Sequence, residues 1–197
     1  MTKKITKKTT KNCAVCKPKC GVCPKGRTSA NGPYTADVME HFMAPHNYGK
    51  IKDPDGVGKV GNLVCGDVMW LYIKVSKNKS SKEIVKDIKF ETFGCVAAIA
   101  TSSAITDLAK GKTLEEAIAI DKQEIVQSLG GLPPIKLHCS VLAADALAEA
   151  IFDYYTKQKR AIPKELEEKH QRIQKEKEIV EEKYEDWTQK EEEIHNR

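Results

Sequence analysis

Hydrophobic and polar residues first form a regular pattern at about residue 34. The stretch YTADVMEHFM places Val38, Met39 and Phe42 on one side of a short helix. Pro45 should end this helix, because the residue before a proline is pushed out of the helical region. Five glycines punctuate residues 47–66, so this segment is expected to be a long connection rich in turns.

Two strand patterns follow the glycine-rich connection. DVMWLYIKV is a run rich in β-forming residues, and EIVKDIKFETF alternates apolar with charged positions. A turn of Lys, Asn and Ser at residues 77–82 separates the two runs. They are therefore predicted to be neighbouring antiparallel strands.

After Gly94 the period of the pattern becomes helical. CVAAIATSSAITDLAKG is small and apolar on nearly all sides, which is typical of a helix buried against a sheet, and Gly111 should end it. Capping boxes at residues 113–116 and 121–124 predict two short helices, the second of which ends at Gly130–Gly131.

An amphipathic helix of about five turns is predicted beyond the diproline. Apolar residues from Leu147 to Tyr155 share one face, and Asp145, Glu149 and Asp153 share the other. Strands first and helices afterwards is the α+β pattern. We therefore expect a small antiparallel sheet with helices packed on one face.

From Pro163 the chain is almost wholly charged. An apolar residue recurs every seven positions, at Leu166, Ile173, Val180, Trp187 and Ile194, but the second apolar heptad position is mostly polar. The missing second position argues against an autonomous coiled coil. Residues 161–197 are instead expected to form a long exposed helix, weakly docked on the domain or on a partner.

These patterns divide the chain into a basic, cysteine-rich head (1–33), a domain (34–160) and a charged helical extension (161–197). The net charge of +5 is unevenly spread, because the head carries nine Lys or Arg and no acid, whereas the rest carries 24 basic and 28 acidic residues. The chain is therefore not a general nucleic-acid binder, although the head could contact RNA or an acidic partner. Without metal the head is expected to be disordered, because it can bury almost no core.

Hydropathy gives no sign of a membrane partner. No window approaches the roughly 18 apolar residues of a membrane span, and no apolar segment follows the N-terminal lysines as a secretory signal requires. We therefore expect a cytoplasmic protein. In that compartment its seven cysteines indicate metal binding, sulfur chemistry or burial rather than disulfides.

Four cysteines in the head, Cys13, Cys16, Cys20 and Cys23, form two knuckle-like pairs. A structural zinc site is the favoured occupant, and the closing Cys-Pro is similar to ferredoxin runs that hold clusters. Zinc ribbons separate their pairs by more than three residues, so an arm rich in thiols and without metal is the alternative.

The other three cysteines lie at the ends of predicted elements. Cys65 is two residues before Asp67 at the entry to a strand, so thiolate and carboxylate can point to the same face. Cys95 lies at the first turn of a helix, where the helix dipole favours a thiolate, and His138–Cys139 open another helix. Such ligands suit zinc or an iron–sulfur cluster. The alternative is that the cysteines are small buried hydrophobic residues.

The stretch from about Tyr34 to Lys159 resembles the IscU/NifU-type iron–sulfur cluster assembly scaffolds. The matching segments, in order, are YTADVMEHFMAPHN, DGVGKVGNLVCGD, FETFGCVAAIATSS, GKTLEE and GLPPIKLHCSVLAADALAEAI. The blocks CGD, GC and LPPIKLHC are specific when they occur together. The resemblance covers about two-thirds of the chain.

The resemblance implies the family's α+β fold and a ligand site formed by Cys65, Asp67, Cys95, His138 and Cys139. It also implies a scaffold and carrier rather than an enzyme. Persulfide sulfur from a cysteine desulfurase and iron would be built into a transient [2Fe–2S] cluster, which apo iron–sulfur proteins then receive. Zinc is a possible occupant of the same site.

The resemblance further marks LPPIK as the segment read by an Hsp70-type chaperone, with its co-chaperone, during transfer; its residues are Leu132, Pro133, Pro134, Ile135 and Lys136. Lys136 would supply charge, and the prolines would supply a preformed extended shape.

Asp67 and His138 would share the fourth ligand position, where weaker ligation suits release. The alternative for Asp67 is a turn or capping carboxylate.

The chain departs from the family pattern at Val96, where a small residue is common. The 44-residue step from Cys95 to Cys139 leaves no room for the insertion of the zinc-bearing SufU-type branch, which favours the cluster-building branch. No second domain of the longer NifU proteins is expected.

The alternative function is a zinc-bound, persulfide-accepting sulfurtransferase partner that builds no cluster. A third is a zinc- or RNA-binding module driven by the head.

Overall fold

The computed structural model describes residues 32–62, 66–78 and 80–195, and it describes no side chain for Asn62 or from Val180 onward. Its strands are β1 (Gly56–Asn62), β2 (Asp67–Lys77) and β3 (Glu83–Phe93). Its helices are α1 (Ala36–Met43), α2 (Val96–Ala109), α3 (Leu114–Ile118), α4 (Lys122–Ser128), the 3₁₀ turn η1 (Pro134–Lys136), α5 (Leu137–Lys157) and α6 (Lys164–His195).

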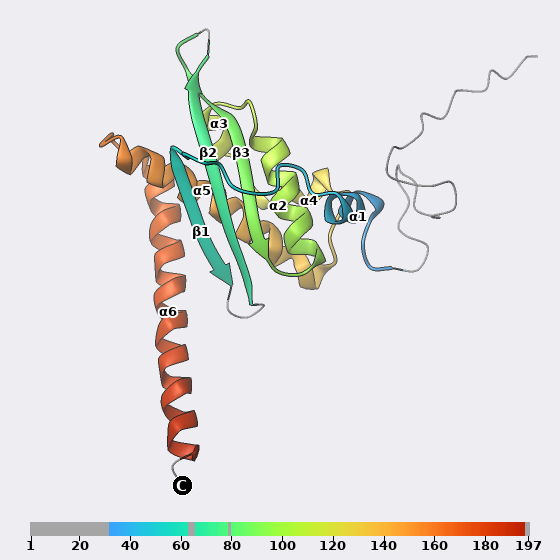
Figure 1. The fold of residues 1–197 in the computed structure, drawn as a ribbon, viewed down its shortest axis with the longest axis vertical. Helices are drawn as coiled ribbons and strands as arrows, with labels where there is room; N and C mark the ends of the chain where they lie inside the picture. The colour runs from blue at the N-terminus through green and yellow to red at the C-terminus, as the bar shows by residue number, and fades with distance from the viewer. Residues whose placement is uncertain (1–31, 63–65, 79, 196–197) are drawn as a thin grey trace, which may run out of the picture.

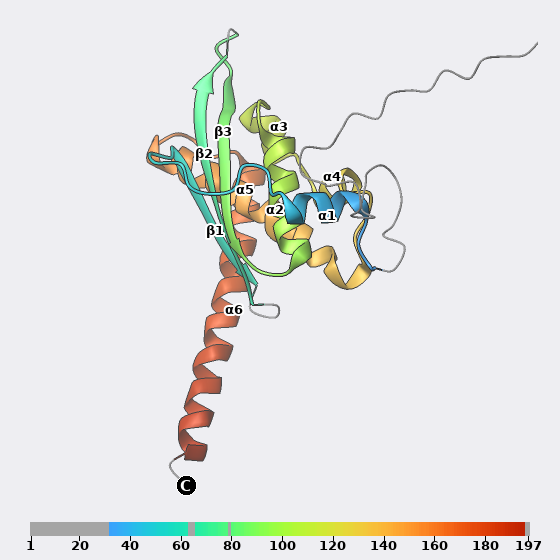
Figure 2. The same ribbon diagram turned by 45° about the vertical axis from the view of Figure 1, so that its right-hand side comes forward.

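The strands form one antiparallel sheet in the order β1-β2-β3, and the helices lie on one side of it (Figures 1 and 2). The alternation of β2 explains this layering, because Met69, Leu71 and Ile73 are fully buried against the helices. From β3, Ile88 and Phe90 join the same core. The predicted α+β fold and the turn between the two predicted strands are confirmed.

The first strand was not predicted, since its glycines resembled a turn-rich connection. Gly58 pairs with Leu71 of β2, and its other side lies against α5. A Cβ atom at Gly58 would lie 2.0 Å from the carbonyl oxygen of Ala146, and one at Gly56 would lie 2.1 Å from that of Ala150. Glycine is therefore required here by the close approach of a helix to the strand rather than by a turn.

Local capping signals position the shorter helices. Thr35 accepts a hydrogen bond from the Val38 amide and starts α1, which ends before Pro45 as predicted. The box of Thr113 and Glu116 is complete in both directions. In the second box the Asp121 side chain accepts a hydrogen bond from the Glu124 amide. The Glu124 carboxylate pairs with Lys112 at 2.9 Å instead of completing the box.

Helix α2 is buried on nearly all sides, as its composition predicts. Two of its hydroxyl groups bond back to the helix, since Thr101 and Ser102 both donate to the Ala98 carbonyl. The chain after α1 runs past α2 and pairs with the edge of β3, where Gly49 donates to the Phe90 carbonyl at 2.8 Å. This pairing holds the residues just after α1 in place.

The C-terminal helix α6 docks on α5 and then extends beyond the domain (Figure 1). Of its seven-residue stripe, Leu166 and Ile173 are buried, while the later positions have no described side chains. The polar face of α5 is not open to solvent at Asp145 and Glu149, because each is only 8% exposed. Arg172 of α6 donates to Asp145 and covers it.

Two further expectations concern membrane contact and the cysteine-rich head. No helix among the described residues is long and apolar enough to cross a membrane. The predicted disordered head, with Cys13, Cys16, Cys20 and Cys23, lies outside the described residues apart from Gly32 and Pro33.

Candidate metal and cluster site

Three element ends meet at the end of the sheet where β2 begins and β3 ends (Figures 1 and 2). Asp67 is the first residue of β2, Cys95 is the N-cap residue of α2, and Cys139 lies in the first turn of α5. Each of these ends is fixed by a strand or a helix packed in the core, so the side chains are held on rigid supports.

The donor atoms of these residues converge. The Cys95 and Cys139 sulfur atoms are 3.9 Å apart. One Asp67 oxygen, Oδ2, lies 4.0 Å from the Cys95 sulfur and 3.8 Å from the Cys139 sulfur. The His138 Nε2 atom is 3.4 Å from the Cys139 sulfur. Two thiols, a carboxylate and an imidazole therefore surround one point.

Asp67 uses its two oxygens differently. The residue is only 2% exposed, and its Oδ1 atom accepts a hydrogen bond from the Cys95 amide at 3.2 Å while Oδ2 faces the thiols. A Cβ atom at Gly94 would lie 2.7 Å from that Oδ1 atom, so only glycine leaves room for the carboxylate. Asp67 thus accepts the Cys95 amide with one oxygen, while its other oxygen faces the two thiols.

Burial controls the protonation of Cys139, which is 1% exposed. Burial raises the pKa of the Cys139 thiol well above its ordinary value, and the charges of Cys95 and Asp67 raise it further, against the opposing effect of Lys136. The thiol therefore keeps its proton at neutral pH in the metal-free protein. A metal ion that binds here must displace that proton.

Lys136 and Tyr34 form the polar border of the site. The charge of the Cys95 thiolate is the main reason why the pKa of Lys136 is raised. Burial raises the pKa of Tyr34, with Cys95 as the next contribution. Tyr34 also packs with Leu132 against the small apolar cluster of Ala97, Ala98 and Cys139. The sequence predicted Lys136 only as a chaperone contact, whereas the structure also places it beside the thiols.

The prolines of LPPIK predict an extended shape, but only part of the segment is extended. Pro133 has the extended angles φ −56° and ψ 141°, but Pro134–Lys136 turn into a 3₁₀ helix that leads directly into α5. Ile135 is 78% exposed within this turn. The turn, rather than an extended strand, presents the apolar side chain to solvent.

Of the five ligand residues expected from the resemblance, the structure brings together Asp67, Cys95, His138 and Cys139. Cys65 lies outside the described residues, as do the four cysteines of the head. Gly94 was not singled out from the sequence, although a glycine directly before a helix-capping cysteine signals a close approach. A second cluster, formed by His41, His46 and Asp107, was also missed.

Thiols with imidazole and carboxylate at one end of an α+β domain are a donor set that suits a soft metal ion or an iron–sulfur cluster. The family comparison gives the class of protein. The NifU-like N-terminal domain model matches residues 33–161, and the chain belongs to that family.

The relatives of the chain are named as assembly scaffolds rather than enzymes. The chain is 58% identical over 124 residues to iron–sulfur cluster assembly scaffold protein IscU 1 of Archaeoglobus fulgidus, covering 63% of this chain and 78% of that protein. It is 49% identical over 128 residues to IscU of Haemophilus influenzae, covering 64% and 98%. It is 43% identical over 127 residues to IscU of Aquifex aeolicus, covering 64% and 79%.

Proposed function

We propose that the protein is a scaffold on which an iron–sulfur cluster, a [2Fe–2S] unit, is assembled and then transferred to apo-proteins. The observation that carries this proposal is the convergence of the Cys95 and Cys139 thiols, 3.9 Å apart, around the carboxylate of Asp67. The names of the relatives support the same function. Cys65 is assigned as the third thiol ligand from its place two residues before Asp67.

The thiols would serve both as sulfur acceptors and as ligands. A thiolate attacks the outer sulfur of a desulfurase persulfide, takes that sulfur and releases the desulfurase cysteine as a thiolate. Each transferred sulfur needs two electrons to become sulfide; oxidation of ferrous iron supplies part of these and an external reductant the rest. Lys136 lies where its charge offsets the negative charge that accumulates near Cys95.

Release would depend on the weaker ligands. A cluster needs four ligand positions, and three thiolates leave one position for Asp67 or His138. The carboxylate already holds the Cys95 amide through Oδ1, so it remains oriented whether or not Oδ2 is bound. An exchangeable oxygen or imidazole ligand lets an incoming thiolate of the target protein take its place.

The second candidate function is a zinc-bound sulfurtransferase partner that accepts persulfide but builds no cluster. It is favoured by one observation, which is that the donor atoms of Asp67, His138 and Cys139 all lie within 4.8 Å of one another, a spacing that suits a single ion. Cys95 would complete a tetrahedral set.

Anaerobic reconstitution separates the two functions. With iron, cysteine, a reductant and a desulfurase, the scaffold should develop visible absorption together with equal amounts of iron and acid-labile sulfide. Cys95→Ser and Cys139→Ser should each abolish the absorption, whereas Cys13→Ser in the head should retain it. Formation of persulfide on a zinc-loaded site, without any chromophore, would instead establish the sulfurtransferase role.

A further inference from the structure

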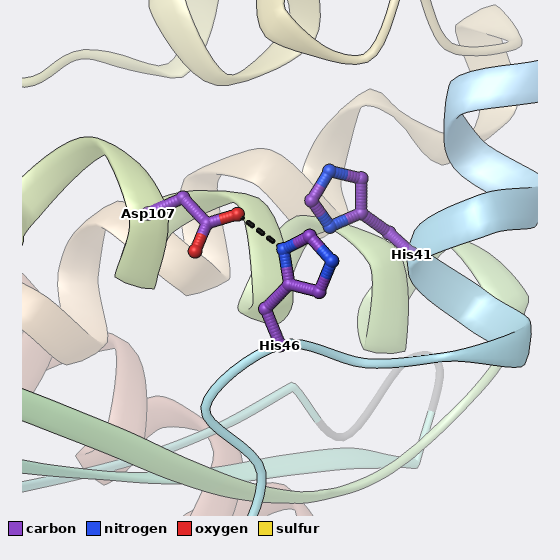
Figure 3. A group of neighbouring side chains, drawn as sticks. All are labelled: His41, His46 and Asp107. Atoms are coloured by element: carbon purple, nitrogen blue, oxygen red, sulfur yellow. Dashed lines mark hydrogen bonds and ion pairs between the residues drawn. The ribbon is translucent and has the colours of Figure 1, made fainter. Parts of the chain in front are cut away.

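A second cluster of donor groups lies at the junction of α1 and α2, away from the thiols. His41 comes from α1, His46 from the chain just after that helix, and Asp107 from the last turns of α2 (Figure 3). Their donor atoms lie within 4.8 Å of one another. Asp107 is twelve residues along α2 from Cys95, which corresponds to about 18 Å of helix. The thiol site therefore does not include this cluster.

Neighbouring groups hold both histidine rings in place. The hydroxyl of Ser103, which is fully buried, lies 2.8 Å from His41 Nδ1 and accepts the His46 backbone amide, also at 2.8 Å. His46 Nδ1 lies 2.6 Å from Asp107 Oδ2. The other oxygen of Asp107 accepts a hydrogen bond from the Asn47 side chain at 3.1 Å. Supporting hydrogen bonds of this kind orient histidine and carboxylate ligands at metal sites.

Carboxylates supply negative charge beside the cluster. The carboxylates of Asp107, Glu40 and Asp37 all act on His41 with negative potential. Burial and the neighbouring His46 lower the pKa of His41 despite these carboxylates. His46 and Asp107 are 47% and 43% exposed, so an ion can reach the cluster from solvent.

We propose that His41, His46 and Asp107 form a binding site for one divalent first-row transition-metal ion, ferrous iron or zinc, separate from the thiol site. Two imidazoles and one carboxylate are a recognised donor set for such ions. The ligands of a tetrahedral zinc ion lie about 3.3 Å apart, so binding would displace the proton shared by His46 and Asp107 and move these side chains slightly apart. The remaining positions would hold water.

The bound ion would join α1 to α2. Among the described contacts, His41 links α1 to α2 through the Ser103 hydroxyl, and His46, just after α1, contacts both Ser103 and Asp107 of α2. A metal bridge across three segments would make the docking of α1 depend on metal concentration, because an ion that binds only the folded state stabilises it. This inference does not depend on the proposed function, since it uses none of the thiol ligands.

Nitrogen-15 spectra of the histidine rings in the full chain, recorded during a zinc titration, test the proposal. The thiol site should fill at its own affinity and move the signals of His138. A second saturable step should move the ring signals of both His41 and His46. Asp107→Asn keeps the size of the side chain and removes its charge. It should weaken zinc binding in the second step by more than about tenfold, because loss of a group that only supports a ligand already costs about tenfold in metal affinity.

The control is His170→Gln in α6. His170 lies 2.7 Å from Glu149, a similar histidine–carboxylate pair, but no third donor joins this pair in the part of the chain that the structure describes. This variant should leave the second step unchanged. Absence of movement in the His41 and His46 signals up to about 1 mM free zinc, or equal affinity in the wild type and Asp107→Asn, would overturn the proposal and leave a purely structural hydrogen-bond cluster.

Discussion

Asp67 is positioned for both roles that the sequence left as alternatives. Its Oδ1 atom accepts the Cys95 amide, which is a capping role, while Oδ2 lies within 4.0 Å of both described thiols. Simple removal of the side chain would therefore confuse loss of a ligand with loss of a buried hydrogen bond. A neutral residue of the same shape separates the two.

Asp67→Asn should make the assembled cluster more persistent and slow its transfer. The amide oxygen can still accept the Cys95 amide, whereas the neutral NH₂ group cannot act as the exchangeable ligand. We expect transfer to an apo-ferredoxin to slow by about tenfold, with little change in the melting temperature. The measurement is the rate of visible-absorption change on mixing with the apo-protein.

Asp153→Asn is the matched control for this prediction. Asp153 also accepts a backbone amide, that of Val57 at 2.8 Å, but it lies near the other end of α5, far along the helix from Cys139. Equal transfer rates in Asp67→Asn and the wild type would show that the carboxylate has no part in release.

At the scale of elements, β1 packs closely on α5 at its glycines. Gly58→Ala would place a methyl group 2.0 Å from the Ala146 carbonyl oxygen, so strand and helix must move apart. We expect a loss of about 3 kcal/mol or more in the free energy of unfolding, as for severe overpacking. Urea unfolding measures this loss.

Gly61→Ala in the same strand provides the comparison. A Cβ atom at Gly61 would meet nothing nearer than 3.8 Å, which is ordinary van der Waals contact. This variant should unfold close to the wild type. If both variants lost the same stability, the close approach of α5 would not be the reason for glycine at position 58.

The docking of α6 on α5 buries charge as well as apolar surface. Burial raises the pKa of Asp145 to about 6, with Glu176 and Glu149 adding to the rise and Arg172 and Lys169 opposing it. The desolvation of the carboxyl group thus outweighs its ion pair with Arg172. The carboxyl group holds its proton more strongly in the folded protein than in the unfolded chain.

The pH dependence of stability should reveal this group. Between about pH 4 and pH 6 the folded state retains a proton that the unfolded state has lost, so Asp145 contributes a fall in stability as pH rises, of up to about 3 kcal/mol. In Asp145→Asn this component should be absent. Urea unfolding at pH 4.5 and pH 7 gives the difference for each protein.

Asp121→Asn, an exposed helix cap where Asn is as favourable as Asp, controls for general charge effects. It should show the same change with pH as the wild type. A pH dependence in Asp145→Asn that matches the wild type would mean that Asp145 is not held protonated by its burial under α6.

On the scale of the whole molecule, the family domain carries two additions of different character. The match covers residues 33–161, so the basic head precedes it and α6 follows it. Helix α6 is joined to the domain by buried residues such as Leu166. The head has four cysteines and nine positive charges but almost no apolar residues for a core, and the prediction that metal binding would fold it lies outside the described residues.

Deletion of residues 1–33 should leave cluster assembly at Cys65, Cys95 and Cys139 nearly unchanged. It should remove any additional metal bound by the four head cysteines and lower the affinity for an acidic partner, because nine positive charges are lost. Side-by-side reconstitution, with metal and sulfide analysis of both proteins, makes the measurement. A truncated protein that assembles no cluster would show that the head belongs to the site.

Local patterns in the sequence determined most of the elements. The helix begun by Thr35 and ended before Pro45, the strands β2 and β3, and the capping box at Thr113 all follow from signals within a few residues. These signals are reliable because backbone angles and capping bonds depend mainly on near neighbours. The cysteines and His138 were likewise recognisable as candidate ligands, and the family resemblance supplied their grouping.

Only the tertiary structure decided which distant residues meet. The glycines of β1 resemble a turn until α5 is packed against them, and Asp145 and Glu149 form an exposed face until α6 covers them. His41, His46 and Asp107 have no common pattern in the sequence and are brought together by the packing of α1 on α2. The physical reason is that close approach, burial and ligand geometry arise from contacts between elements, to which the local periodicity of each element contributes only one side.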